Sequence, residues 1–184
     1  MTLHIEGFPK SGNTFLKYAG ERFFGFTPAI VSHTVSKIKL AVELNEPIFI
    51  TLRDPIDSIA SFIHFKGDTD SPKIERYTGY YERLYETVCL NKEHVFLAPF
   101  KDIVFDVNAV LIEGAKKFNI SDYTPIDHVS VYEDMKNNSQ FNMFLPGDRD
   151  YFYLKARDIV GAADINTFSK CYDLYYELLE GTLT

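Results

Sequence analysis

The chain has little cysteine, no tryptophan and no long apolar run. The scarcity of cysteine and of apolar runs limits the classes of protein to which it can belong. Its 184 residues contain no stretch that approaches the roughly 20 apolar residues of a membrane-spanning helix. Residues 1–6 do not have the basic-then-apolar layout of a secretion signal. Cys89 and Cys171 do not have the spacing of a metal site, so we expect reduced core thiols. These absences favour a cytoplasmic protein that does not bind a membrane.

Positive charge is also in short supply. Lysine and arginine together number 19 against 26 aspartates and glutamates, and the formal net charge is −7. A negative surface disfavours nonspecific nucleic-acid binding, so an anionic ligand must be held by a local cluster of cations. The hydrophobic content of 46% is that of a folded chain, and the length favours one domain over residues 1–184.

Short apolar runs alternate with segments of helical periodicity. The expected strands cover residues 3–7, 47–52 and 94–98, and the expected helices cover residues 12–24, 36–44, 55–65, 74–88 and 103–118, with a last helix through the apolar stripe 168–179. The segment 129–150 is expected to be the least regular, with a turn at 146–148. This alternation predicts a three-layer α/β fold, in which a parallel sheet is flanked by helices.

The most informative segment is residues 10–14, Lys-Ser-Gly-Asn-Thr, directly after the first expected strand. Backbone N–H groups at the start of a helix, together with the helix dipole, form a site for phosphate. The spacing from Gly7 to Gly12 nearly reproduces the nucleotide-binding P-loop, Gly-x4-Gly-Lys-Ser/Thr. Asn13, however, occupies the usual lysine position, and the lysine has moved into the loop as Lys10. This displacement argues against a magnesium-nucleotide phosphotransferase and for a differently used phosphate cradle.

A second candidate site follows the second expected strand. Arg53 lies at the carboxyl end of that strand, where open α/β sheets bind their ligands. Ser61 follows about two helical turns later, roughly 12 Å along the axis. A guanidinium and a hydroxyl placed in this way could both reach one extended anion. The alternative is that Arg53 pairs with Asp54 or Asp57 and that Ser61 only packs.

Together the two sites resemble a known family. Residues 8–15, Phe-Pro-Lys-Ser-Gly-Asn-Thr-Phe, are similar to the loop by which PAPS-dependent sulfotransferases bind the 5′-phosphosulfate of 3′-phosphoadenosine-5′-phosphosulfate (PAPS). Residues 53–55, Arg-Asp-Pro, with Asp57 and Ser61, resemble the 3′-phosphate motif of that family. The layout is closest to the cytosolic type, which places a histidine about twenty residues before this arginine, and His33 stands there.

Two later segments resemble further motifs of the family. Residues 130–138 are similar to the adenine-side segment Thr-Ser-Phe-x-x-Met-Lys-x-Asn, and residues 152–156, with 160–161, resemble the Arg-Lys-Gly loop on the 3′-phosphate. The chain departs from the family at Phe15, where the cytosolic enzymes usually have tryptophan. It also departs within 154–156, where leucine and alanine replace arginine and glycine.

The resemblance implies a P-loop-like fold of the sulfotransferase and nucleotide-kinase type. It also implies transfer of a sulfuryl group from PAPS, without a metal, to a hydroxyl or amine of a small-molecule or glycan acceptor, leaving 3′-phosphoadenosine-5′-phosphate (PAP). Lys10 would stabilise the leaving phosphate, and His33 would take the acceptor's proton. The implied PAPS-binding residues are Lys10, Ser11, Gly12, Asn13, Thr14, Phe15, Arg53, Ser61, Ser130, Tyr132 and Lys155. Aromatic side chains of residues 62–85 would suit an apolar or aromatic alcohol, and a sugar or amine fits equally.

Other interpretations stay open at this point. The P-loop-like spacing also fits a small nucleotide or metabolite kinase, and the changes at 154–156 fit a protein that binds PAPS or PAP without turnover. His33 could be a capping or core-edge residue, and Tyr132 could be a core aromatic. Phe100, which follows the third expected strand, is a candidate for contact with adenine.

Overall fold

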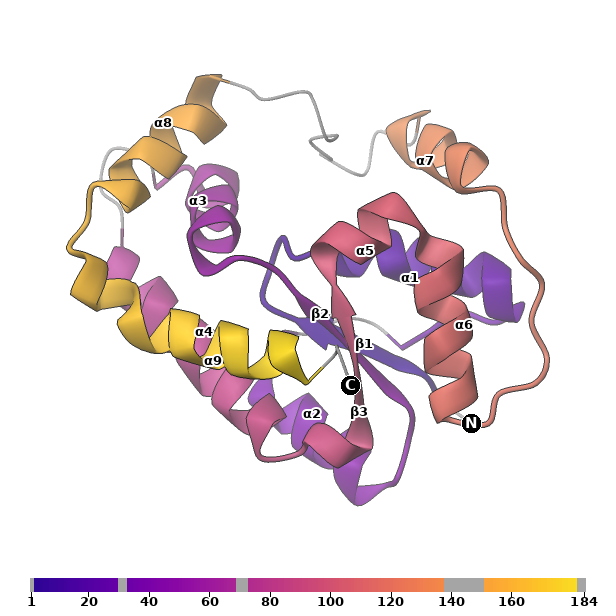
Figure 1. Ribbon diagram of the computed structural model, residues 1–184. Coiled ribbons are helices and arrows are strands. Elements are labelled where there is room, and N and C mark those ends of the chain that lie inside the picture. Colours follow the sequence, from indigo (N-terminus) through magenta and orange to yellow (C-terminus); the bar gives the residue numbers. More distant parts are fainter. Residues whose placement is uncertain (1, 30–32, 69–72, 138–150, 182–184) are drawn as a thin grey trace.

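The computed structural model describes residues 2–29, 33–68, 73–137 and 151–181, and these form an α/β fold (Figure 1). Strands β1 (His4–Gly7), β2 (Ile48–Leu52) and β3 (Val95–Pro99) make a parallel sheet in that order. Gly7 is paired with Thr51, and Leu52 with Pro99, so the carboxyl ends of the strands meet at one edge. The parallel sheet predicted from the apolar runs is confirmed.

Helices occupy most of the remaining described chain. They are α1 (Asn13–Phe24), α2 (Val35–Glu43), α3 (Pro55–Lys66), α4 (Ile74–Cys89), α5 (Phe100–Phe105), α6 (Val107–Lys117), α7 (His128–Asn137), α8 (Tyr151–Gly161) and α9 (Ser169–Glu180), with short 3-10 turns at η1 (Lys92–His94) and η2 (Ile165–Phe168). Among the residues described here, no helix combines the length and the apolar composition needed to cross a bilayer.

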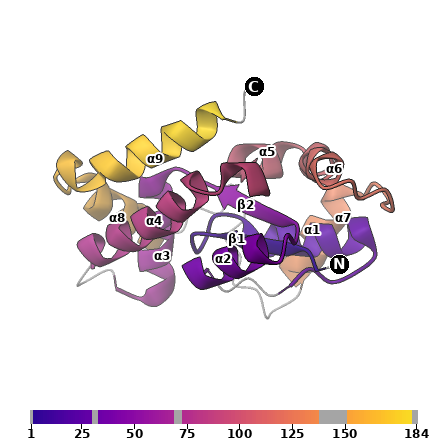
Figure 2. The ribbon, with the colours of Figure 1, turned by 90° about the horizontal axis from the view of Figure 1, so that it is seen from below.

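The central strand divides the apolar core into two parts. All five residues of β2 are buried, and successive side chains point to opposite faces of the sheet. Phe49 belongs to the core with Leu16 of α1 and Leu111 of α6. Ile50 belongs to the other core, which includes Leu84 of α4. Figures 1 and 2 show α1 and α6 on one side of the strands and α2, α4 and α9 on the other. The sheet is therefore flanked by helices on both faces.

Gly114 is the position where α6 packs most closely on the sheet. A Cβ atom added there would lie 2.1 Å from Phe49 Cζ, a distance that real contacts do not reach. We expect Gly114→Ala to lower the free energy of unfolding by about 1–3 kcal/mol, the usual cost of overpacking a core. Thermal unfolding checks this, with Gly161→Ala as the matched control because nothing lies within 4 Å of its added Cβ. Equal melting temperatures for the two variants would contradict the expectation.

Three segments differ from the sequence-based expectation. The helix expected over 103–118 is two helices, because the backbone at Asp106 is extended (φ −150°) and its carboxylate accepts from the Ala109 amide to cap α6. Residues 128–137 are helical where an irregular segment was expected, and the expected loop at 152–156 lies in α8. Among the residues of these helices whose burial is described, the buried apolar ones are Val131 and Met135 in α7 and Ala156 and Val160 in α8, a weak periodic signal. The turn expected at 146–148 lies outside the described residues.

Candidate functional site

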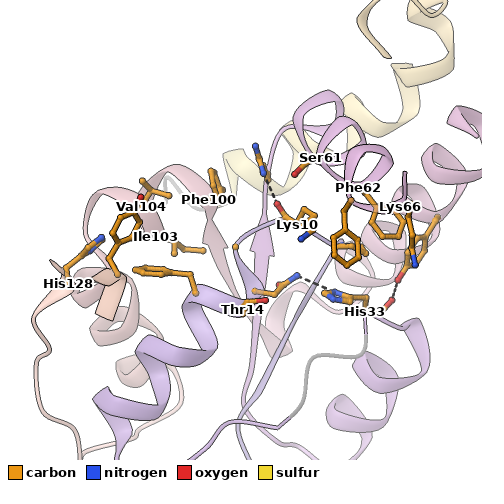
Figure 3. A pocket seen from close by; sticks show the side chains of 18 residues that line it. Lys10, Thr14, His33, Ser61, Phe62, Lys66, Phe100, Ile103, Val104 and His128 are labelled. Carbon is orange, nitrogen blue, oxygen red and sulfur yellow. Dashed lines mark hydrogen bonds between the residues drawn. The ribbon is translucent and has the colours of Figure 1, made fainter. Parts of the chain in front are cut away.

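A cavity of about 480 Å³ lies at the carboxyl edge of the sheet. The segment after each strand contributes to it: Lys10 after β1, Arg53 after β2 and Phe100 after β3. Such an edge is where ligands bind in open α/β sheets. Figure 3 shows the cavity extending from His128 and Val104 at one end to Phe62, Lys66 and His33 at the other, with Lys10 between them. The predicted residues that line it are Lys10, Gly12, Asn13, Thr14, Phe15, His33, Arg53, Ser61 and Tyr132.

The loop between β1 and α1 is shaped by backbone conformations that glycine favours. Gly7 has φ 148°, and a Cβ atom there would lie 2.2 Å from Thr51 Oγ1, so only glycine allows β1 and β2 to approach so closely. Gly12 has φ 95° and is the N-cap of α1, where it has no side chain to cap the helix. The first-turn amides of α1 are therefore left for a ligand, at the positive end of the helix dipole.

Lys10 places a partly buried ammonium in this loop. Its Nζ lies 3.8 Å from the centre of the Phe65 ring, a cation–π contact across the cavity. Burial lowers the pKa of Lys10 below its ordinary value, because desolvation disfavours the charged form. The backbone of Lys10 is left-handed (φ 66°), and its carbonyl accepts a hydrogen bond of 2.7 Å from Arg53 Nη1. Lys10 and Arg53 are thus joined through the loop backbone.

Arg53 is held by contacts that leave part of its guanidinium for a ligand. The group lies over the Phe100 ring, 4.4 Å from its centre, and the Arg53 carbonyl accepts from the Tyr81 hydroxyl at 2.9 Å. Arg53 Nε is buried and has no hydrogen-bond partner in the part of the chain that the structure describes. A buried donor without a partner costs free energy, and a bound anion would remove that cost.

The carboxylates beside Arg53 have other partners. Asp54 caps α3 by accepting from the Asp57 amide at 3.0 Å, and it also accepts from the Tyr172 hydroxyl at 3.2 Å. Asp57 pairs with Arg157 at 2.9 Å. These contacts therefore do not support the alternative in which Arg53 forms an ion pair with Asp54 or Asp57.

His33 is anchored at the opposite end of the cavity from His128 (Figure 3). Its Nδ1 lies 2.8 Å from the Gly7 carbonyl, and since a carbonyl can only accept, Nδ1 is the protonated nitrogen. Its amide donates to Glu6 at 2.8 Å, and its carbonyl accepts from the Tyr80 hydroxyl. In the neutral ring, Nε2 then carries the lone pair.

The protonation of His33 is set mainly by burial. Desolvation lowers its pKa below the ordinary value of 6.5, and the charge of Lys10 acts in the same direction. The hydrogen bond to Gly7 and the charge of Glu6 oppose this shift without cancelling it. The imidazole is accordingly neutral at pH 7 and can accept a proton through Nε2.

Asn13, at the position of the P-loop lysine, points inward. Its Nδ2 donates to the Phe8 carbonyl at 2.9 Å, and its Oδ1 accepts from the Thr51 hydroxyl. Nδ2 also lies 3.3 Å from His33 Nδ1. Because Nδ1 carries the proton that it donates to Gly7, these two nitrogens are both donors, and the Asn13 side chain bonds the loop and the β2 strand, not the histidine.

Three predicted residues do not line the cavity. Ser11 is fully buried, with its Oγ 3.3 Å from Ser58 Oγ. Ser130 on α7 accepts from Arg22 at 3.4 Å, and Lys155 is exposed on α8. Their proposed contacts with PAPS stay predictions that this arrangement does not favour.

Aromatic side chains supply much of the remaining wall. Phe15 lies 5.3 Å from the His128 ring and 6.4 Å from the Tyr132 ring, at one end. Phe62, Phe65 and Tyr80 line the cavity too, as expected of aromatic residues between 62 and 85. The sequence did not single out Tyr80, because the helical spacing within residues 74–88 follows other tyrosines, Tyr77, Tyr81 and Tyr85, which are buried. His128 and Glu6 were not predicted either. For Glu6, the available signal was an acidic residue inside an apolar strand.

Comparisons with protein-family models, with curated proteins and with solved structures found no match to this chain.

Proposed function

We propose that this protein is a PAPS-dependent sulfotransferase with a P-loop-like fold, transferring a sulfuryl group to a hydroxyl or amine of an acceptor. The observation that carries the proposal is that Lys10, His33, Arg53 and Ser61 line one cavity although they are distant in sequence. Its volume is in the range of small-molecule and cofactor sites. The cations Lys10 and Arg53 and the neutral imidazole of His33 suit a doubly phosphorylated donor and an acceptor that must lose a proton.

The donor is proposed to lie along the cavity with its adenine at the aromatic end. Phe15, Phe100 and Tyr132 offer ring faces and edges there, and base–aromatic stacking is worth about 1–3 kcal/mol per base. The 5′-phosphosulfate would then reach the loop at the start of α1, where backbone N–H groups and Lys10 can hold it. Phe15 in place of the family's tryptophan offers a smaller stacking surface.

The 3′-phosphate is assigned to Arg53 and Ser61. Arg53, whose Nε is buried without a partner among the described residues, and Ser61 on α3 both line the cavity. Arginine is suited to phosphate because its planar fork can donate two parallel hydrogen bonds. The bond from Arg53 to the Lys10 carbonyl keeps this fork next to the loop that would hold the other end of the donor.

The proposed reaction is an in-line displacement at sulfur. The acceptor oxygen or nitrogen gives its proton to His33 Nε2 and forms the new bond to sulfur, while the bond between sulfur and the phosphate oxygen breaks. The electron pair of the broken bond stays on that oxygen, which becomes part of PAP. Lys10 stabilises the negative charge that develops there. His33 then releases its proton to solvent.

Thermal unfolding with PAP and with AMP tests the donor site. PAP differs from AMP by the 3′-phosphate, so we expect PAP, with no divalent cation added, to raise the melting temperature well above the effect of AMP. At 100 times its dissociation constant, PAP adds about 2.7 kcal/mol, or roughly 5–10 °C for a chain of this size. Arg53→Ala should remove the advantage of PAP over AMP and leave the AMP effect unchanged.

The other outcomes separate the alternatives. Stabilisation by ATP with Mg²⁺ and not by PAP would replace the proposal with a kinase. Stabilisation by PAP without any turnover of PAPS across an acceptor panel would identify a binding protein. No stabilisation by any of these nucleotides would reject a nucleotide site.

A further inference from the structure

A second cavity, of about 450 Å³, adjoins the first and is rich in positive charge. The two cavities share Phe62, Lys66 and Tyr80 in their walls. The other cations that line the second cavity are Lys73, Arg76 and Arg83, and the carboxylate that lines it within the described chain is Asp68. We call this second cavity the basic cavity. Its cationic excess stands out in a chain whose net charge is −7.

Helical spacing places the two arginines around the residue that connects the cavities. Arg76, Tyr80 and Arg83 are four and three residues apart in α4 and so lie on one face of the helix. The Tyr80 hydroxyl donates to the His33 carbonyl. The arginines therefore flank the tyrosine that supports the proposed base.

The carboxylate of the basic cavity is already engaged. Asp68 accepts from the Tyr77 hydroxyl and pairs with Lys73 at 3.4 Å. The hydrogen bond from Tyr77, with the charges of Lys73 and Arg76, holds the pKa of Asp68 below its ordinary value, so it stays ionised and keeps these partners. Lys73 and Asp68 offset each other, which leaves Lys66, Arg76 and Arg83 as the excess charge.

The remaining three cations are placed to hold an anion beside an aromatic surface. Lys66 Nζ lies 5.4 Å from the centre of the Phe62 ring, at the boundary of the two cavities. The positive charge of Arg83 lowers the pKa of the Tyr80 hydroxyl, but burial has the larger effect and raises that pKa to about 12. Tyr80 therefore keeps its proton and its bond to His33 while positive charge stands beside it.

From these contacts we propose that the basic cavity binds an anionic group of the acceptor, a carboxylate, phosphate or sulfate. The acceptor's nucleophilic hydroxyl or amine then lies at His33, and its carbon skeleton crosses the shared wall of Phe62 and Tyr80. This inference rests on the proposed sulfotransferase function and adds that acidic acceptors are preferred to neutral ones. Guanidinium groups fit it because they bind such anions through paired hydrogen bonds.

Inorganic pyrophosphate, titrated by calorimetry with excess PAP present to fill the first cavity, is the direct probe. We expect binding that weakens at least about tenfold in the Arg76→Gln, Arg83→Gln double variant, the effect of losing charged hydrogen bonds. Lys39→Gln, an exposed lysine on α2, is the control for a change of charge alone. Absence of binding, or equal binding by the double variant, would overturn the basic cavity as an anion site.

A matched pair of acceptors tests the role of that anion. 4-Hydroxyphenylacetate and 4-hydroxyphenylacetamide have similar shapes and differ in charge, and we expect kcat/KM at least about tenfold higher for the acid. The double variant should lose this preference, with similar kcat/KM for the acid and the amide. Equal values in the unaltered protein would overturn the preference for acidic acceptors. PAP should stabilise the double variant as well as the unaltered protein, because these arginines lie outside the first cavity. If PAP does not stabilise the unaltered protein, the sulfotransferase proposal itself is rejected.

Discussion

Replacing Lys10 by alanine is expected to lower kcat for the proposed sulfuryl transfer by about 100- to 1000-fold, the usual cost of removing one group that stabilises developing charge. Negative charge grows on the leaving phosphate only as the bond to sulfur breaks, so the ammonium matters most in the transition state. Its position over the Phe65 ring, in a partly buried site, strengthens this interaction because little water screens it. Binding of PAP should weaken far less, by about tenfold or less, since the contacts proposed for Arg53 would stay.

Rates at saturating PAPS, with PAP affinity measured separately, check this expectation. Lys10→Gly is a second variant that suits the left-handed backbone at this position, where φ is 66°, and it should lose the same rate as the alanine variant. Lys101→Ala, at an exposed lysine of α5, is the control for loss of one positive charge. A loss of kcat below tenfold in both Lys10 variants would remove Lys10 from the chemical step.

The sheet could be predicted because its strands are buried on both faces. Residues 47–52 are almost continuously apolar, and β2 is buried along its whole length between two helical layers. The local sequence is enough to predict such a strand, because both of its faces are apolar and no alternation of apolar and polar residues has to be recognised. The break at Asp106 was harder, because an aspartate within an amphipathic pattern fits both an exposed helical position and an N-cap.

The site could be predicted where it depends on strand ends. The loop at 10–14 and Arg53 each follow a strand, and parallel strands bring their carboxyl ends to one edge. Ser130 and Lys155 belong to α7 and α8, which are placed by helix packing, and no strand end fixes their side chains relative to the cavity. Sequence motifs name residue types in order, but packing decides which of them face the ligand.

Tyr80 illustrates a further limit. The periodic tyrosines Tyr77, Tyr81 and Tyr85 are all buried in the core, and Tyr80, one step off that stripe, lines both cavities. A helix such as α4 packs one face against the core and lines a site with another. Hydrophobic periodicity identifies only the face that packs against the core. The face with Arg76, Tyr80 and Arg83 becomes visible only once α4 is placed beside α3.

Replacing His33 by glutamine is expected to lower kcat/KM by about 100- to 10 000-fold, the range for loss of a general base. Glutamine still carries an N–H group that can donate to the Gly7 carbonyl, so the segment held by Glu6 and Tyr80 should stay in place.

The imidazole must be neutral to take the acceptor's proton. In the unaltered protein kcat/KM should therefore rise with pH through the pKa of His33, which burial holds below 6.5, and be level by neutral pH. At alkaline pH the rate should fall as Lys10, whose pKa lies below 10.5, loses its charge.

A pH profile separates this role from a structural one. His33→Gln should remove the acidic limb and keep the alkaline one, while PAP still raises the melting temperature. His128→Gln is the matched control, because His128 lines the same cavity at the end away from His33 and should keep both limbs (Figure 3). A His33 variant that loses activity but retains the acidic limb would mean that another group takes the proton, with His33 serving to shape the loop through Gly7 and Glu6. An acidic limb centred above 6.5 would contradict the effect of burial on this imidazole.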